Sequence, residues 1–262
     1  MTDGIIQLGL LDDDQIPLDE AALALALLDN PETDLDPYRD ILDDIATRLV
    51  EDGADTNRER AVLLAQVIAG EYGFTGDIDH YDDPANADLI RVIDRRCGLP
   101  VALAILYVTA ARRAGWSAHV LDVPGHVLIL VGDEVVPVII NPFKDGAAIG
   151  PGDLAALVTS GRRGAPATVQ IAAMPNRALL VRLLLNQAKR AEQSGDVERA
   201  HDLFERITAF APSYGGVWWE RARLELIVGD TVSARASLVA VLETTRDLDV
   251  RARVKETLAT LA

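Results

Sequence analysis

Cysteine is nearly absent from this sequence, because its 262 residues include only one, Cys97. A single thiol cannot form an internal disulfide, and a disulfide-free chain of this size is most simply cytoplasmic. Long apolar runs are absent too, since none approaches the roughly 18 residues that a membrane-spanning helix needs. The short apolar segment Ile5–Leu11 has no basic flank, so we predict neither a signal peptide nor a membrane anchor.

Positive charge is scarce near the amino terminus. Residues 1–56 hold 16 of the 41 acidic residues but only two of the 25 basic ones, Arg39 and Arg48. Nucleic acids and anionic lipids are bound through Lys and Arg, so a chain with a formal charge of −16 is not expected to bind either. We interpret the acidic segment as a solubilising surface, with a docking site for a basic partner as the alternative.

Cofactor and nucleotide signatures are missing as well. The sequence has no phosphate-binding glycine loop, serine elbow or dinucleotide fingerprint, and we predict no cofactor. The run Asp79–Asp83 contains His80 and could suggest a metal loop. Because no second cluster of Cys or His accompanies it, we interpret this run as a solvated turn and predict no metal site.

Helical periodicity dominates the first half of the chain. A capping box, in which the Thr56 and Glu59 side chains each bond the other's backbone N–H, opens one helix. Another begins at Pro100, where proline costs no hydrogen bond, and is apolar on nearly every side, so it should be the buried central helix. The predicted helices are Leu18–Leu28, Pro37–Val50, Thr56–Tyr72, a short helix from Asn86 or Asp88 to Arg95, and Pro100–Gly115.

Strand-like segments follow the central helix, at residues 117–121, 127–131 and 135–140. Helices followed by antiparallel strands, with no βαβ alternation, indicate an α+β fold. Pro137 falls within the third segment, and proline cannot donate to a strand ladder, so we expect this strand at an edge or a bulge. Residues 169–172 are a further candidate strand.

Three residues that could form a catalytic triad occur in a characteristic order along the chain. Cys97 precedes the central helix, His126 follows a Pro-Gly turn and opens the second strand, and Asn141 ends the third. This is the chain order of a papain-like or transglutaminase-like triad. The Cys97 thiolate would be the nucleophile, His126 its general base, and Asn141 the group that orients the ring. The competing interpretation is an ordinary loop cysteine and a histidine that only holds a strand end.

The last ninety residues carry an internal repeat. Gly195-Asp196 recurs as Gly229-Asp230 and Ala200 recurs as Ala234, each 34 residues later. This is the period of the tetratricopeptide repeat, a helix-turn-helix unit, although several of its large marker residues are absent here. A final amphipathic helix, Val250–Leu261, would cover the last unit.

Together these segments resemble a known family, the bacterial SirB-type transglutaminase-like proteins. The motifs that carry the resemblance are Phe74–Gly76, Tyr81–Pro84 with Asn86, Arg95–Pro100, Gly125–His126 and Asn141–Phe143. The resemblance covers nearly the whole chain and implies a papain-like core of helix plus antiparallel sheet, followed by an all-α block of tetratricopeptide-like repeats. It implies the fold more firmly than any activity.

The sequence departs from the family's pattern at two positions. In active transglutaminases the nucleophilic cysteine lies on the first turn of the central helix, which here is near Pro100 or Val101, whereas Cys97 comes earlier. The family also usually has aspartate where this chain has Asn141, although asparagine can still orient a histidine.

Two hypotheses about function follow. We expect a transglutaminase-like domain with acidic amino-terminal helices at 1–173 and tetratricopeptide-like helices at 174–262. The first hypothesis, which we favour, is a non-catalytic module that binds a protein or peptide partner. The second is a thiol enzyme using Cys97, His126 and Asn141 on an amide or isopeptide bond, as a protease or an acyltransferase. The sequence leaves the oligomeric state open.

Overall fold

The computed structural model describes residues 2–123, 125–132, 136–160 and 172–261, which form two compact units. Pro17–Leu180 make one unit, here called the core unit, and Met1–Ile16 with Val181–Ala262 make the other, the helical unit. From the sequence, the acidic amino-terminal helices were expected to belong to one domain with the core, at residues 1–173. In the structure, helix α1 (Thr2–Leu10) instead packs on α9 (Val197–Phe210), where Gly9 lets its backbone approach Ala209 closely.

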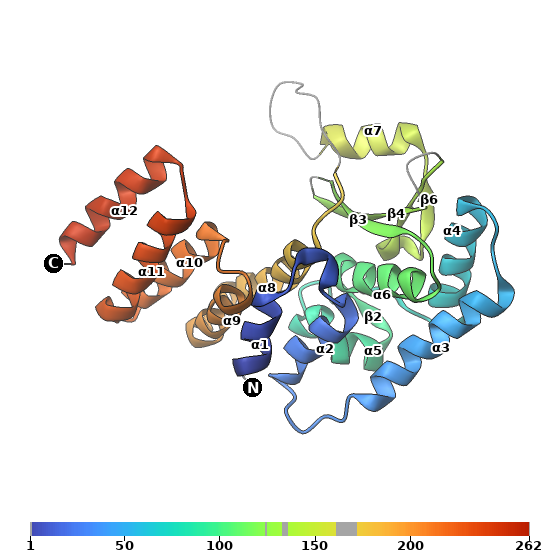
Figure 1. Ribbon diagram of the computed structural model, residues 1–262, viewed down its shortest axis with the longest axis horizontal. Coiled ribbons are helices and arrows are strands. Elements are labelled where there is room, and N and C mark those ends of the chain that lie inside the picture. The colour runs from blue at the N-terminus through green and yellow to red at the C-terminus, as the bar shows by residue number, and fades with distance from the viewer. Residues whose placement is uncertain (1, 124, 133–135, 161–171, 262) are drawn as a thin grey trace. The chain divides into compact units, whose positions relative to one another are not determined.

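Helices form most of the core unit, and the helices predicted there are confirmed (Figure 1). The Thr56 hydroxyl accepts a bond from the Glu59 N–H at 3.2 Å, and the Glu59 carboxylate accepts one from the Thr56 N–H at 2.9 Å, so the capping box is present. The helix that it opens ends in a π-helical turn, η2 (Gln66–Glu71), which the sequence did not indicate. The α-helices of this unit are α2 (Leu18–Leu27), α3 (Asp36–Asp52), α4 (Asn57–Ala65), α5 (Leu89–Arg95), α6 (Pro100–Arg113) and α7 (Pro151–Ser160), and α8 (Asn176–Gln193) begins in it.

Helix α6 is the central helix of the core unit, as predicted. Every residue from Val101 to Ala111 is buried. Helices α2 and α3 pack on one side of α6, and strands β3 (Ala118–Val123) and β4 (His126–Val131) pack on the other. Figure 1 shows α6 lying between the sheet and these helices. A helix enclosed on all sides needs the continuous apolar surface that its sequence supplies.

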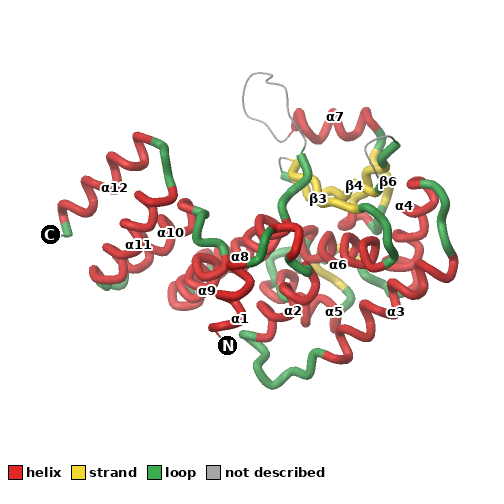
Figure 2. Tube along the Cα trace, viewed as in Figure 1, coloured by secondary structure: helices red, strands yellow, loops and turns green. Residues whose placement is uncertain are grey.

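The sheet is antiparallel, with the order β3-β4-β5-β6. Strand β5 spans Val138–Asn141 and β6 spans Ala147–Ile149. Figure 2 shows this sheet in yellow beneath α7. Side chains alternate between the two faces of a strand, so one face of β3 and β4 packs on α7 through Leu121, Val123 and Leu128, and the other face lies on α6.

One strand prediction was wrong, and two elements were missed. Strand β5 is not an edge strand, because it pairs with β4 on one side and β6 on the other. Pro137 lies just before β5 begins, so its missing N–H interrupts no ladder bond. The sequence analysis did not predict β6 or α7. Of the further candidate strand at 169–172, residues 169–171 lie outside the described residues, and an isolated bridge joins Ala173 to Leu121.

The helical unit consists of α1 and a succession of antiparallel helices. After α8 and α9 come α10 (Gly215–Ile227), α11 (Thr231–Thr244) and α12 (Leu248–Thr260). The last helix covers the preceding pair, because Val254 is fully buried against Leu238 and Val241. A helix at the predicted end of the block therefore closes an apolar surface, as terminal helices of a helical array must.

The 34-residue pattern corresponds to two turns of the same local geometry. Gly195 and Gly229 both have a φ of +81°, a conformation that favours glycine. Asp196 caps α9 through a bond from a backbone N–H at 3.0 Å, and Asp230 caps α11 in the same way at 3.0 Å. The sequence repeat therefore encodes two equivalent helix starts, and its assignment to the tetratricopeptide class stays a prediction.

Candidate functional site

The candidate nucleophile lies before helix α6. Cys97 begins the short strand β2 (Cys97–Gly98), which pairs in parallel with β1 (Thr75–Gly76). Leu99 is the N-cap of α6 and Pro100 is its first helical residue. The first turn of the helix therefore carries Pro100 and Val101, neither of which has a nucleophilic side chain. The half-buried Cys97 thiol is held by the strand pair that precedes the helix.

The surroundings of Cys97 disfavour a thiolate. The Cys97 Sγ lies 3.9 Å from a carboxylate oxygen of Asp77, at hydrogen-bond distance for sulfur. Burial raises the pKa of the thiol, the neighbouring Arg95 guanidinium partly opposes this, and the Asp77 carboxylate raises the pKa further. Reactive cysteines usually lie in electropositive surroundings that lower the thiol pKa. The net effect at Cys97 has the opposite sign.

Asp77 is the centre of a buried polar network. One of its oxygens accepts a bond from the His80 backbone N–H at 2.8 Å, and the other accepts one from the Arg95 guanidinium at 2.9 Å. Arg95 also donates to the fully buried Asn86 side chain at 3.1 Å and lies 3.5 Å from Asp83. The His80 N–H is the largest of several contacts that keep the pKa of Asp77 below its usual value. Asp77 is therefore an anion that fixes the loop beside Cys97.

Sequence reasoning found only part of this network. It identified the motifs that contain Asn86 and Arg95, but it overlooked Asp77. The one available signal was an acidic residue directly after Phe74–Gly76, with an arginine two residues before Cys97. Arg95 is paired with acidic groups, whereas its neighbour Arg96 stacks on the Phe74 ring at 4.7 Å. Both arginines thus have structural contacts.

His126 is the first residue of β4 and pairs with Val123 across the hairpin. It is half-buried. Because side chains alternate along a strand, His126 shares a face with Leu128 and Leu130, which pack on the α7 side of the sheet. The register therefore turns the imidazole away from the face that lies on α6.

Asn141 ends β5, where its side chain caps the turn that follows. Its amide oxygen accepts a bond from the Phe143 backbone N–H at 3.0 Å, opening the short helix η4 (Pro142–Lys144). Phe143 then packs on Gly76, where a Cβ would lie only 2.5 Å from the Phe143 ring. The Tyr81 and Phe143 rings are nearly perpendicular, with a centroid distance of 5.7 Å. The Asn-Pro-Phe motif thus joins β5 to β1.

The three candidate residues are brought together only in part. Continuing the β4–β5 register places Asn141 opposite Leu128, so Asn141 and His126 lie at one end of the sheet and on one face. Cys97 lies on a different strand pair and contacts Asp77. Among the described residues, no hydrogen bond joins any two of the three side chains. The arrangement preserves the order of a triad without forming its bonds.

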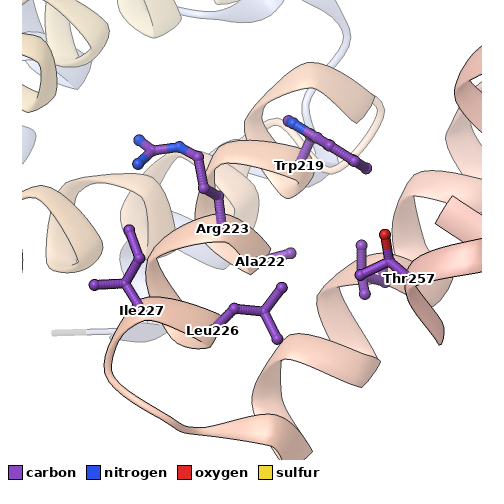
Figure 3. A pocket seen from close by; sticks show the side chains of 7 residues that line it. Trp219, Ala222, Arg223, Leu226, Ile227 and Thr257 are labelled. Atoms are coloured by element: carbon purple, nitrogen blue, oxygen red, sulfur yellow. The ribbon is translucent and has the colours of Figure 1, made fainter. Parts of the chain in front are cut away.

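The helical unit contains a separate apolar cavity of about 320 Å³ (Figure 3). Figure 3 shows Ala222 and Leu226 pointing from α10 toward α12, which carries Thr257. Trp219 forms one wall, and the Arg253 guanidinium stacks on its ring at 5.6 Å. The residues that line the cavity are Trp219, Ala222, Arg223, Leu226, Ile227, Leu238 and Thr257. A cavity of this size and apolar lining can accept side chains of a bound peptide.

The described ranges contain no group of three His, Cys, Asp or Glu residues that could hold a metal ion. In the run predicted as a solvated turn, Asp83 caps the short helix η3 (Pro84–Ala87), and the His80 side chain is exposed. Across the same residues, no helix has the length and apolar character that crossing a membrane requires.

Comparison with known proteins identifies the core. The sequence profile of the transglutaminase-like superfamily matches residues 36–185. A UPF0162 protein of Xylella fastidiosa (strain 9a5c) is 26% identical over 243 residues, covering 90% of this chain and 86% of the relative. A UPF0162 protein of Vibrio cholerae is 31% identical over 140 residues, covering 51% of this chain and 50% of the relative. A crystal structure of menin, described as revealing its binding site for the Mixed Lineage Leukemia protein, has a TM-score of 0.43 at 13% identity, covering 92% of this chain and 69% of menin.

Proposed function

The chain belongs to the transglutaminase-like superfamily, and we propose that it is a non-catalytic member that binds a protein or peptide partner. Within the superfamily we assign it to the SirB-type branch, on the Pro-Gly-His and Asn-Pro-Phe motifs. We assign the helices after residue 173 to tetratricopeptide-like repeats, on the 34-residue pattern. We also place the protein in the cytoplasm, because its one thiol has no disulfide to form.

The observation that carries this proposal is the environment of Cys97. A cysteine nucleophile needs a thiolate, which a helix N-terminus and a nearby imidazolium stabilise. Cys97 precedes α6 instead of lying on its first turn, and its Sγ lies beside the Asp77 carboxylate. Burial and this negative charge hold the thiol pKa above its ordinary value. Such a thiol is protonated at neutral pH and is a poor nucleophile.

Alkylation of the full-length protein tests the absence of catalysis. Iodoacetamide should modify Cys97 slowly at neutral pH, and the midpoint of the curve of rate against pH should lie above about pH 8.5, the ordinary thiol pKa. Changing His126→Ala should leave this pH profile unchanged, because no hydrogen bond joins His126 to Cys97 among the described residues. Fast alkylation near pH 6, slowed by His126→Ala, would establish the thiol enzyme instead.

The thiol enzyme remains the second candidate because the sheet register places His126 and Asn141 on one face. In that mechanism His126 would accept the Cys97 proton, the thiolate would attack an amide carbonyl, and the proton would pass to the leaving amine. Water or an acceptor amine would then release the acyl group. The alkylation profile separates this candidate from the non-catalytic one.

The cavity of the helical unit supplies the binding surface in our proposal. Ile227 lines this cavity and is 62% exposed, whereas its neighbour Val228 is 64% exposed and lies outside the lining. A buried charge in an apolar binding pocket is costly, so Ile227→Glu should abolish partner capture in quantitative pull-downs. Val228→Glu, which adds the same charge at equal exposure, should retain it. Equal capture by both variants and the unmodified protein would remove the cavity from the proposal.

A further inference from the structure

Strand β6 presents an unpaired edge of the sheet. It is the last strand in the order β3-β4-β5-β6 and pairs only with β5 among the described residues. Ala147 and Ala148 are exposed, and the strand has no charged residue or proline. Proteins commonly protect sheet edges with such residues, because an open edge offers backbone donors and acceptors to another chain. The edge of β6 lacks this protection, apart from its short length.

A groove of about 480 Å³ runs beside this edge. Helix α4 forms one wall with Ala61, Val62 and Ala65. Ala65 lies four residues after Ala61 and three after Val62, so it shares a helical face with each of them. Strands β5 and β6 form the other wall, where Ile140 and Ala148 are paired and therefore share a face of the sheet. The volume falls in the range of ligand sites in proteins.

The backbone just before β6 packs closely against helix α4. Gly146 is buried with a φ of +74°, and a Cβ there would lie 2.7 Å from the Ala65 Cβ. The π-helical turn that follows α4 begins at Gln66, which also lines the groove. Single π-helical turns are rare and occur often at functional sites. The groove is thus bounded by a specific backbone arrangement.

Arg58 adds a charge to the groove. It lies one helical turn before Val62 on α4, lines the groove and is exposed. The described residues provide no ion pair or hydrogen bond for its guanidinium. An arginine in this position can form a charge-assisted bond to a carboxylate of a bound molecule. The occupant that fits is apolar along the groove and acidic near Arg58.

We propose that the β6 edge and the adjoining groove bind an extended segment of a partner protein by strand addition. The segment pairs its backbone with β6, inserts alternate apolar side chains between α4 and the sheet, and places an acidic residue against Arg58. This site goes beyond the proposed function, since it uses neither Cys97 nor the cavity lined by Trp219.

The test uses the full chain and a defined probe, a fluorescein-labelled octapeptide of alternating threonine and valine with one terminal aspartate. Fluorescence anisotropy should detect binding with a Kd below about 1 mM. Val62→Gln should weaken binding about tenfold. Val50→Gln is the matched control, because Val50 is 60% exposed and Val62 is 50% exposed. It should have no effect on binding, because Val50 lies on α3, outside the groove.

Two peptide variants test the backbone pairing and the charge. A peptide with N-methylated valines cannot donate those backbone bonds and should bind about tenfold more weakly. Arg58→Glu should weaken the aspartate peptide and strengthen a peptide that ends in lysine, whereas Arg91→Glu, an exposed control on α5, should change neither.

Three results would overturn the proposal: no binding at about 1 mM peptide, binding that Val62→Gln and N-methylation leave unchanged, or occupation of the edge by a second copy of this chain. Sedimentation of the unmodified and Val62→Gln proteins would detect that copy as a dimer lost in the variant. These results leave the proposed function intact, because it is tested at Cys97 and Ile227. Likewise, a reactive thiol at Cys97 would leave the proposal of peptide binding at the β6 edge unaffected.

Discussion

A neighbouring carboxylate favours the protonated thiol, whereas a neighbouring imidazolium favours the thiolate. Cys97 lies next to a carboxylate. The Cys97 Sγ lies 3.9 Å from an Asp77 oxygen, and among the described residues it forms no hydrogen bond with His126 or Asn141. Since Asp77 is itself held by Arg95 and the His80 N–H, its charge is fixed in place. A residue type alone therefore says little about reactivity, because neighbouring charges decide which protonation state is populated.

The raised pKa of Cys97 predicts a loss of stability at alkaline pH. Below the unfolded pKa of about 8.5, the thiol is protonated in both states and contributes no pH dependence. Above it, the unfolded chain releases the proton first, so the free energy of unfolding falls until pH passes the folded pKa. Urea titrations should show the unmodified protein losing stability relative to Cys97→Ala between neutral and alkaline pH. A constant difference between the two proteins would contradict this expectation.

At the scale of elements, helix α6 organises the core unit through its end as well as its faces. Arg113, in the last turn of α6, forms ion pairs with Asp19 of α2 and Asp43 of α3. Asp19 is buried, and Asp43 is exposed. The pairing with Asp19 satisfies a carboxylate that would otherwise be costly to bury.

Changing Arg113→Met should destabilise the protein by roughly 2 kcal/mol, because it leaves the Asp19 carboxylate buried without its partner. The double variant Arg113→Met with Asp19→Asn should recover part of this loss, since the unpaired charge is then removed. Chemical denaturation of the two variants measures the difference. Arg113→Met with Asp43→Asn is the matched control and should recover little, as Asp43 is exposed. Equal recovery in both double variants would argue against the role of burial.

The elements that the sequence predicted best are those with local causes. The Thr56 capping box and the all-round apolar α6 depend on residues within one helix, and both are present. Strand β6 was missed because Ala147 and Ala148 carry no strand signal of their own and are extended only through their pairing with β5. The π-helical turn after α4 was also missed, because the sequence pattern predicted one continuous helix as far as Tyr72 and does not distinguish a π-helical turn from an α-helical one.

The whole molecule carries a strong negative charge that is concentrated in its first 56 residues. Like charges close together oppose the compact state, and salt screens them over about 10 Å at 0.1 M. The exposed ion pair between Arg48 and Glu71 is also screened, but such pairs contribute little. Repulsion should therefore dominate the response to salt.

Raising sodium chloride from about 0.02 M to about 0.5 M should increase Tm by roughly 2–4 °C, the size that about 1 kcal/mol produces in a chain of this length. Differential scanning calorimetry measures the shift, and potassium chloride should give the same result if simple screening is responsible. A Tm that falls with salt would mean that the ion pairs outweigh the repulsion.

Only part of the geometry of the candidate site could be predicted from the order of its residues in the sequence. The sequence correctly predicted that His126 and Asn141 lie on antiparallel strands, and these strands are neighbours in the sheet, since hairpin registers are local. It did not imply that the Asn141 oxygen binds the Phe143 N–H. Nor could it reveal Asp77 beside Cys97, because that contact spans 20 residues and depends on the parallel pairing of β1 with β2. Contacts between distant segments are set by packing, which a linear pattern does not record.

The packing of Phe143 on Gly76 joins two stretches of chain that are far apart in sequence. Closing so long a loop is slow compared with forming a local helix turn. A larger residue at Gly76 would displace that phenyl ring and is therefore expected to slow the joining of these two stretches while leaving the local helices able to form.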